Sequence, residues 1–436
     1  MTRSNQPNPS RRKVLGGAAA AAGAITLGCK TTGSHLDRDI PVAPDKDPMD
    51  AGATIRIGMI GVGGMGGGHM NGLLDQAKRG DDKHEVVALC DVAQPRLDDR
   101  LAQARAKAPD TEITGYTKHE DLLARDDIDC VLIASTEHWH AQHAVDAIAA
   151  GKDVYVEKPM TLRLDDALWM YRVMEANPHM RLQVGTQYMM GEKYGHARRL
   201  IAEGRIGHPT FSQTSYCRNS KGGEWLYGID DRIQPGDTLD WDRWCGPLGP
   251  REWDTEIYHR WRRYKDFSTG IIGDLLVHQM TPLAWALDSG WPTRVTACGG
   301  HYVDKAMENH DQINMTVQWE KEHTMIVAGA TCNELGLDTL VRGHEGNIRL
   351  GGANCILQPE RIFVDDVDEE RINCKSHDDQ GNLRLDWLKA VRTRGQNQSQ
   401  IEMATKIMVA VDLATRSIWE GKAFAYDSKT MTARAL

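Results

Sequence analysis

The chain has 436 residues, of which 41% are hydrophobic and 26% charged, so it can bury a large core divided over two or three domains. Its formal net charge of −9 and pI near 6.0 argue against a nucleic-acid partner, because the composition has no excess of basic residues to neutralise phosphates. The cysteines that follow Cys29 are scattered and form no C-x-x-C pair, so we expect neither a metal site nor a disulfide framework.

The first 29 residues predict an export signal. Arg11 and Arg12 precede an uncharged run over residues 14–28 that is too short to span a bilayer. This pattern resembles a twin-arginine (Tat) signal, whose pathway carries folded proteins, although a Val replaces the usual Phe. Cys29 follows a Gly as in a lipoprotein cleavage site, but the two residues before that Gly match poorly. We expect a periplasmic protein and leave a lipid anchor at Cys29 open; a tail with chance arginines is the alternative.

After a Pro-, Asp- and Gly-rich linker over residues 30–53, the chain predicts a dinucleotide site. The stretch "TIRIGMIGVGGMGGGHM" indicates a strand that runs into a G-x-G-x-x-G loop opening a helix. Gly61 permits the tight turn, Gly63 lets the backbone approach a pyrophosphate, and Gly66 allows close packing at the positive helix end. Met65 lies within the same loop. The motif alone is weak in a chain with 42 glycines, so its context has to support it.

That context is a second strand, "EVVALCDV", which ends on Asp91. Asp91 lies at the distance downstream where a carboxylate accepts hydrogen bonds from the adenosine ribose. Because a carboxylate repels a 2′-phosphate, the predicted cofactor is NAD rather than NADP.

Alternating strand and helix patterns predict a parallel, doubly wound sheet over residues 54–160. The stretches "DCVLIAS", "HAQHAVDAIAAG" and "DVYVEKP" read as strand, helix and strand. The last strand ends on Glu157 and Lys158. They could form a surface salt bridge that contributes little. Since cofactors bind at the carboxyl ends of such strands, we expect both side chains to point into a cleft.

The second half of the chain predicts a further sheet and late helices. Five strand patterns fall within residues 161–380, and two amphipathic helical patterns within residues 381–436 are expected to pack back on the first domain. Asp274 and His278 are spaced i and i+4, so on a helix they share one face. An intrahelical Asp–His pair is the simple interpretation, and a metal pair would need a third ligand that the sequence does not indicate.

Seven stretches together resemble the Gfo/Idh/MocA family of NAD(P)-dependent sugar and polyol oxidoreductases. They are "GVGGMG", "CDV", "HWHAQHA", "AGKDVYVEKPMTL", "QVGTQYM", "AEGRIG" and "STGIIGDLLVHQM", and the resemblance extends from residue 54 over nearly all of the chain. It implies a Rossmann domain followed by an open-faced, mostly antiparallel sheet. The E-K-P motif followed by D-x-x-x-H is the most specific part of the resemblance.

The resemblance also implies a catalytic set. Lys158 is expected to contact and polarise the reacting oxygen while hydride leaves for the nicotinamide. His278 is expected to titrate near neutrality as a general acid/base, and Asp274 to hold a neighbouring sugar hydroxyl. Fewer glycines precede Asp274 than in the family pattern, so the resemblance does not define the local backbone geometry.

Further residues are expected at the cofactor and the substrate. By resemblance, Glu157 contacts the cofactor ribose, and other cofactor contacts come from Ser135, Thr136, His140 and Gln187. An N-cap at a helix start explains the Ser and Thr equally well. Candidate substrate contacts are Arg218, Arg262 and Tyr264, in a stretch rich in tryptophans that we expect mostly to pack in the core.

An exported dehydrogenase would need a cofactor that travels bound and is regenerated in place. The predicted function is therefore NAD-dependent oxidation of a sugar, glycoside or polyol hydroxyl on a tightly bound cofactor. A redox-neutral glycosidase or lyase of the same fold is an alternative, but the glycosidase relatives carry a Tyr where this chain has Leu275 and lack the E-K-P lysine. A non-catalytic sugar-binding module is the third interpretation. The open sheet face predicts a homo-oligomer.

Overall fold

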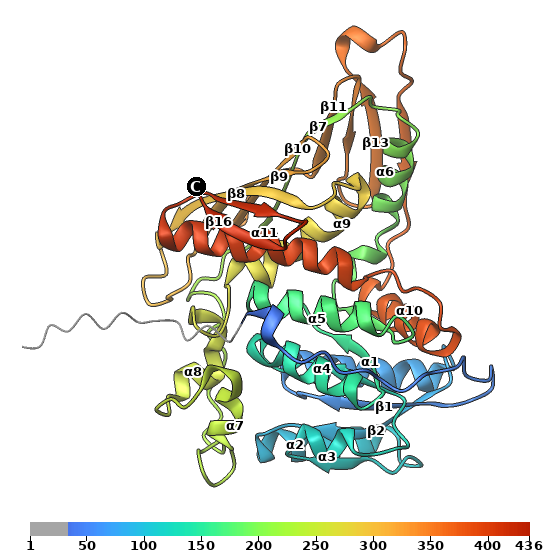
Figure 1. Ribbon diagram of the computed structural model, residues 1–436, viewed down its shortest axis with the longest axis vertical. Helices are drawn as coiled ribbons and strands as arrows, with labels where there is room; N and C mark the ends of the chain where they lie inside the picture. The colour runs from blue at the N-terminus through green and yellow to red at the C-terminus, as the bar shows by residue number, and fades with distance from the viewer. Residues whose placement is uncertain (1–33) are drawn as a thin grey trace, which may run out of the picture.

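The computed structural model describes residues 34–436, and the predicted export signal therefore lies outside the described residues. Figure 1 shows two stacked lobes, each built on its own sheet. The fold class confirms the expectation from the sequence: a parallel, doubly wound sheet comes first and a mostly antiparallel sheet follows.

The first sheet has six parallel strands in the order β3-β2-β1-β4-β5-β6. They are β1 (Ile55–Ile60), β2 (His84–Cys90), β3 (Thr114–Tyr116), β4 (Cys130–Ile133), β5 (Asp153–Val156) and β6 (Leu182–Val184). Helices α1 (Gly64–Arg79), α2 (Gln94–Lys107), α3 (His119–Leu123), α4 (His140–Ala149) and α5 (Leu164–Ala176) connect them. The central strands are buried along nearly their whole length, as strands covered on both faces should be. Strand order reverses between β1 and β4, which marks the edge where ligands bind in such sheets.

The second sheet has ten strands in the order β14-β13-β12-β11-β7-β10-β9-β8-β15-β16. They are β7 (Pro209–Cys217), β8 (Pro292–Gly300), β9 (Gln312–Trp319), β10 (His323–Ala330), β11 (Leu340–Gly343), β12 (Gly346–Arg349), β13 (Asn354–Pro359), β14 (Glu370–Asn373), β15 (Phe424–Asp427) and β16 (Thr432–Ala435). Along β9, buried and exposed residues alternate, and the exposed ones are Asn314, Thr316 and Gln318. The exposed face of this strand therefore carries hydroxyl and amide side chains rather than apolar ones. The homo-oligomer expected from the sequence stays a prediction.

Helices join the two lobes. α11 (Ile401–Glu420) packs on β8 and on α5, so it lies between the second sheet and the Rossmann helices, as Figure 1 shows. α10 (Asp379–Thr393) packs on α1 and buries Trp387 in the Rossmann core. α6 (Glu192–Ala202) and α9 (Val277–Leu287) contact each other on the inner side of the second sheet. Among the described residues, no helix has both the length and the apolar character needed to cross a membrane.

The structure differs from the expected boundaries in three places. β6 extends the Rossmann sheet beyond residue 160, because this strand of only three residues pairs with β5. The last strands, β15 and β16, extend the second sheet rather than pack on the first domain. The described part of the expected linker is packed along the Rossmann domain: the Asn177 side chain accepts from Ala43 N at 2.7 Å, and Trp169 donates to Asp39 O at 2.8 Å.

An insert between β7 and α9 lies beside the Rossmann sheet. Residues 218–269 contain α7 (Trp241–Cys245) and α8 (Thr255–Arg260), drawn in yellow-green beside α2 and α4 in Figure 1. Its aromatic cluster buries four rings, those of Trp241, Trp244, Tyr258 and Phe267. Residues 272–276 then form a single π-helical turn before α9, where the sequence predicts a regular helix.

Candidate active site

A crevice of about 1000 Å³ opens at the carboxyl edge of the Rossmann sheet. One wall consists of the ends of β1, β2, β4 and β5. The opposite wall comes from the insert and comprises Arg243, Trp244, Tyr258, Trp261 and Arg262. The crevice thus lies between the predicted cofactor domain and a segment that contributes aromatic rings and positive charge.

The glycine loop forms one end of this crevice. Gly61 has a φ of +81°, and a Cβ there would lie 2.5 Å from Ser135 N. A Cβ at Gly66 would lie 2.0 Å from Gly61 O, so only glycine permits this close contact between helix and turn. α1 begins after Gly63 with no side-chain cap. Its first N–H groups lie beside the lining residues Gly63, Gly64 and Met65, and the backbone fits the pyrophosphate of a dinucleotide.

Asp91 lines the same crevice at the end of β2. Its Oδ2 accepts from Val62 N at 3.0 Å, and its Oδ1 accepts from Ala93 N at 3.0 Å. These two bonds fix the carboxylate beside the glycine loop, and each oxygen keeps a lone pair for a ribose hydroxyl. Arg96, which was not predicted from the sequence, also lines the crevice, and its guanidinium lies 5.3 Å from the ring centre of Tyr258.

Lys158 and Asp274 meet at the end of β5. Lys158 Nζ donates to Asp274 Oδ1 and to its backbone oxygen, both at 3.0 Å, and each side chain is only 7% exposed. Arg262 Nε donates to the same Oδ1 at 2.9 Å. Burial alone would raise the pKa of Asp274, but the charges of Lys158 and Arg262 hold it far below its usual value. Asp274 therefore binds two cations, whereas the sequence analysis expected it mainly to hold a substrate hydroxyl.

His278 lies one turn further along the same segment and is buried. Its ring centre lies 5.3 Å from that of Tyr188 and 6.1 Å from that of Tyr216. Among the residues that the structure describes, its Nδ1 has no hydrogen-bond partner. Burial, followed by the charge of Lys158, lowers the pKa of His278 to about 3. The imidazole is therefore neutral near pH 7, and the expectation that it titrates near neutrality is corrected for this structure.

Glu157 is buried beside the lysine and is held by the protein itself. His69 Nε2 donates to Glu157 Oε1 at 2.8 Å, and Lys158 N donates to Oε2 at 3.0 Å. Burial would raise the pKa of Glu157, but the His69 hydrogen bond and nearby positive charges lower it. Since Glu157 still lines the crevice, the ribose contact implied by the resemblance remains a prediction. His69 was not identified from the sequence, although its position on the buried face of α1 could have indicated it.

The turn after β4 brings the other expected cofactor residues to the crevice. Ser135, Thr136 and His140 all line it. Neither of the first two hydroxyls caps a helix N-terminus: Ser135 Oγ instead lies 3.1 Å from His143 Nδ1. His140 Nδ1 donates to Pro159 O at 2.8 Å and so ties this turn to the Lys158–Pro159 peptide, which is cis.

Six expected residues do not line the crevice: Gly66, Gln187, Arg218, Tyr264, Asp274 and His278. Gln187 lies in a short 3-10 turn, Gln187–Met190, before α6. Arg218 pairs with Glu224 at 3.2 Å and donates to Tyr216 OH at 3.1 Å. Tyr264 packs against the aromatic cluster of the insert. Of the three candidate substrate contacts, only Arg262 reaches the crevice.

Glu137 is a buried crevice residue that the sequence analysis missed. Its Oε1 accepts from Ser268 Oγ at 2.8 Å, and its Oε2 lies 3.4 Å from Thr269 N. Burial, followed by the negative charge of Asp274, raises the pKa of Glu137 to about 7. Its place directly after Thr136 at a strand end is a signal that could have found it.

The glycine loop, Asp91 and the crevice beside them define a dinucleotide-binding Rossmann protein. Residues 55–186 match a profile described as "Oxidoreductase family, NAD-binding Rossmann fold", and residues 240–425 match "Oxidoreductase family, C-terminal alpha/beta domain". Both profiles represent the Gfo/Idh/MocA oxidoreductases and together they span most of the chain, which therefore belongs to that family. Its Rossmann domain is an NAD-binding domain.

Individual relatives match over shorter stretches. An inositol 2-dehydrogenase of Burkholderia multivorans is 31% identical over 191 residues, 43% of this chain and 54% of that protein. A glycosyl hydrolase family 109 protein of Shewanella pealeana is 27% identical over 228 residues, 47% of each chain. The chain thus spans about half the length of the curated relatives it matches.

Solved structures share the fold over a larger part of the chain. An NAD-binding oxidoreductase from Klebsiella pneumoniae superposes with a TM-score of 0.66 at 19% identity, covering 85% of this chain and 98% of the other. A levoglucosan dehydrogenase in complex with NADH and L-sorbose gives a TM-score of 0.65 at 15% identity, with the same coverage. At these identities the likeness supports the fold alone.

Proposed function

We propose that this protein oxidises a secondary hydroxyl of a sugar, glycoside or polyol by hydride transfer to a bound NAD. The observation that carries the proposal is a buried cluster that reaches the crevice through Lys158, which is paired with Asp274. His278 lies one turn beyond Asp274, and its buried Nδ1 has no hydrogen-bond partner among the described residues. When bound, NAD supplies the hydride acceptor. A relative named inositol 2-dehydrogenase supports a polyhydroxylated substrate.

The protein groups handle the proton. His278 is neutral at pH 7 because burial lowers its pKa to about 3, so its free Nδ1 can accept the substrate's hydroxyl proton. Lys158 donates a hydrogen bond to the same oxygen and stabilises the negative charge that develops there. The C–O bond of the substrate becomes a carbonyl, and the hydroxyl proton passes to His278.

Asp274 and Arg262 position this pair. Both cations bind Asp274 Oδ1, which leaves Oδ2 for a neighbouring substrate hydroxyl. Arg262 also lies 4.2 Å from the ring centre of Trp261, so one end of the crevice combines an aromatic face with hydrogen-bond donors. Such a surface suits a polyol, which has apolar C–H faces and many hydroxyls.

The proposal includes a retained cofactor. The insert is tied to the Rossmann domain where the adenosine half of the crevice lies: His138 Nε2 and Trp139 Nε1 both donate to Trp244 O at 2.8 Å. Gln94 N donates to Thr238 O at 2.8 Å, and Arg243 pairs with Glu120 at 2.9 Å. Opening the crevice requires several of these contacts to break, which supports slow release of the nucleotide. Slow release is consistent with the proposed Tat export of the folded, loaded protein to the periplasm.

A redox-neutral glycosidase or lyase is the second candidate. Relatives named glycosyl hydrolase family 109 protein favour it, at 27% and 28% identity. Such an enzyme would return the hydride within one turnover and release an aglycone, so product analysis separates the two functions.

The test starts from purified protein. Denaturation should release NAD, and addition of a panel of polyols and glycosides to the native protein should raise the reduced-nicotinamide absorbance with at least one of them. Release of an aglycone without lasting reduction would favour the glycosidase. Binding of sugars without either signal would leave only a binding module and would contradict the proposal.

A further inference from the structure

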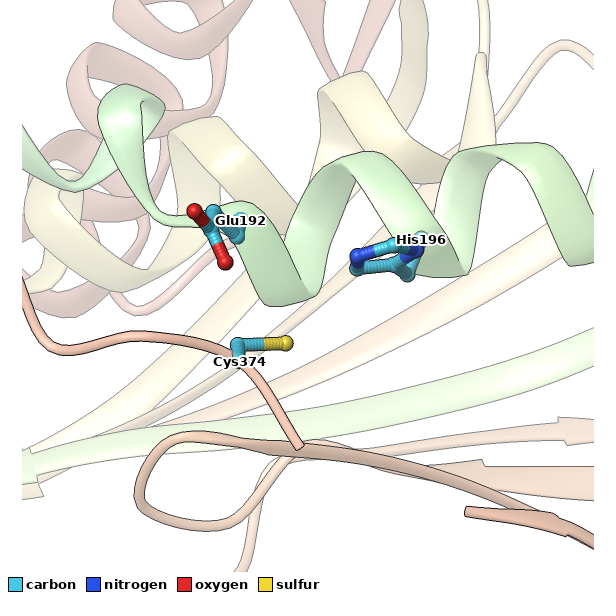
Figure 2. A group of neighbouring side chains, drawn as sticks. All are labelled: Glu192, His196 and Cys374. Carbon is cyan, nitrogen blue, oxygen red and sulfur yellow. The ribbon is translucent and has the colours of Figure 1, made fainter. Parts of the chain in front are cut away.

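Three side chains that commonly bind metals converge far from the crevice. Glu192 and His196 lie one turn apart on α6, and Cys374 follows β14. One ligand atom from each, the carboxylate oxygen, the imidazole nitrogen and Sγ, lie within 4.8 Å of one another. Figure 2 shows the three side chains between α6 and the strand-to-helix connection below it.

The carboxylate of this cluster is already held in place. Lys375 N donates to Glu192 Oε2 at 3.0 Å, and His377 Nε2 donates to Oε1 at 2.7 Å. Hydrogen bonds of this kind orient carboxylates that bind metals and reduce the entropy lost on binding.

The thiol is placed beside that negative charge. Cys374 is half-buried and forms no disulfide within residues 34–436. A divalent cation between the carboxylate and the thiol would bind both, since metal binding releases the thiol proton.

We propose that Glu192, His196 and Cys374 form a zinc site, with water as the fourth ligand and His377 as a positioning residue for the carboxylate. One sulfur, one imidazole nitrogen and one carboxylate oxygen match the ligands that Zn²⁺ takes in proteins. Tetrahedral bonds of about 2.0–2.3 Å need ligand atoms roughly 3.3–3.8 Å apart. The ligand atoms here lie within 4.8 Å of one another, so small side-chain rotations bring them to that spacing. No metal site was expected from the sequence, because the cysteines are scattered and form no C-x-x-C pair.

The site would fix a connection between the two lobes. Beyond Cys374 the chain continues directly to α10, where Gln380 Nε2 lies 3.6 Å from Met65 Sδ and 3.4 Å from His69 Nε2. The zinc ligands themselves do not line the crevice. We therefore expect zinc to stabilise the junction between α6, β14 and α10 without taking part in the reaction.

The probe is Co²⁺ added to the purified full-length protein after chelator treatment, because a Co²⁺–thiolate bond gives a near-ultraviolet charge-transfer band. Wild-type protein should show the band with one equivalent of Co²⁺, and Zn²⁺ should displace it and raise Tm. Cys374→Ser should lose the band, and His196→Gln should weaken Zn²⁺ binding. His377→Ala should keep the band but weaken Zn²⁺ binding by about tenfold, as expected for a group that orients a ligand.

Cys332→Ser and His208→Gln are the matched controls, since they remove a half-buried thiol and an exposed imidazole elsewhere in the same lobe. Both should bind like wild type. Retained NAD shows that each variant is folded. The proposal is overturned if wild type shows no band, if Cys374→Ser keeps it, or if a folded His196→Gln variant binds Zn²⁺ as tightly as wild type. Sugar oxidation is not a readout of this test, so its loss neither supports nor contradicts the zinc site.

Discussion

Replacing Lys158 by Met tests whether the E-K-P lysine takes part in the chemistry. Met preserves most of the side-chain length but removes the charge and the donors to Asp274. If the lysine polarises the reacting oxygen, hydride transfer should slow by roughly 100-fold or more. NAD binding should change little, because the glycine loop and Asp91 are untouched.

The expected loss of stability follows from the burial of the pair. A surface pair would contribute at most about 1 kcal/mol, but the side chains of Lys158 and Asp274 are each 7% exposed. Removing one partner of a buried pair costs about 3–5 kcal/mol. Arg262 Nε stays 2.9 Å from the same carboxylate oxygen, so we expect the lower end, about 3 kcal/mol. Lys158→Met with Asp274→Asn should recover part of this stability but none of the rate.

The assay is single-turnover reduction of the bound NAD by a polyol, followed at the reduced-nicotinamide absorbance, with unfolding measured in parallel. Lys152→Met is the matched control: Lys152 is also buried, precedes the opposite end of β5, and donates to Arg125 O at 2.7 Å. It should lose stability at an unchanged rate. A wild-type rate in folded, NAD-loaded Lys158→Met protein would refute the catalytic role of the lysine.

Four further outcomes are expected. Asp91→Ala should weaken NAD binding and relax discrimination against NADP, measured by titration; tighter binding of NADP than of NAD by wild type would contradict the ribose argument. Arg11→Lys with Arg12→Lys should keep the protein in the cytoplasm, folded and loaded, and unchanged export in fractionated cells would remove the Tat interpretation. Trp244→Ala should speed NAD release at least about tenfold in a dilution chase, because part of a wall of the crevice is lost. Trp253→Ala should leave the release rate unchanged, because Trp253 belongs to the same aromatic cluster but does not line the crevice. Burial raises the pKa of Glu137 from 4.5 to about 7, so the folded state loses stability as the pH rises through that range and the carboxyl ionises. Glu137→Gln should therefore raise Tm more at pH 8 than at pH 5. An equal change in Tm at both pH values would contradict the pKa shift.

Features with a local cause were predictable from the sequence. The glycine loop follows from a turn that demands positive φ at Gly61 and from the contact between Gly66 and Gly61 O. Long apolar strands and their alternation with helices led to the correct fold class. The boundary at residue 160 failed because β6 has only three residues, too few for a periodic pattern, and is defined by pairing with β5.

The site was less predictable where distant segments meet. The spacing of Asp274 and His278 indicated one helical face, but not the π-helical turn or the arrival of Arg262 at the same carboxylate. Burial of His278 depends on tertiary packing against Tyr188 and Tyr216, and this is why a titration near neutrality was expected and a pKa of about 3 was found. The residues of the proposed zinc site were not predictable for the same reason. Neither the spacing of Glu192 and His196 nor the isolated Cys374 indicates a metal site by itself.

The charges of the cluster explain how one site can both hold a neutral base and favour an oxyanion. Lys158 and Arg262 carry two positive charges, and Asp274 balances one of them through a single oxygen. Burial, followed by the charge of Lys158, disfavours protonation of His278, so the imidazole is neutral at pH 7 but is a weaker base than a free histidine. The same charge lowers the free energy of a substrate oxygen that is losing its proton, and burial strengthens the attraction because water is excluded. Neutralising Asp274 would increase the positive charge of the cluster, but it would also release Lys158 and Arg262 from their positions. The principal contribution of Asp274 is therefore to hold these two positive charges where the substrate oxygen must bind.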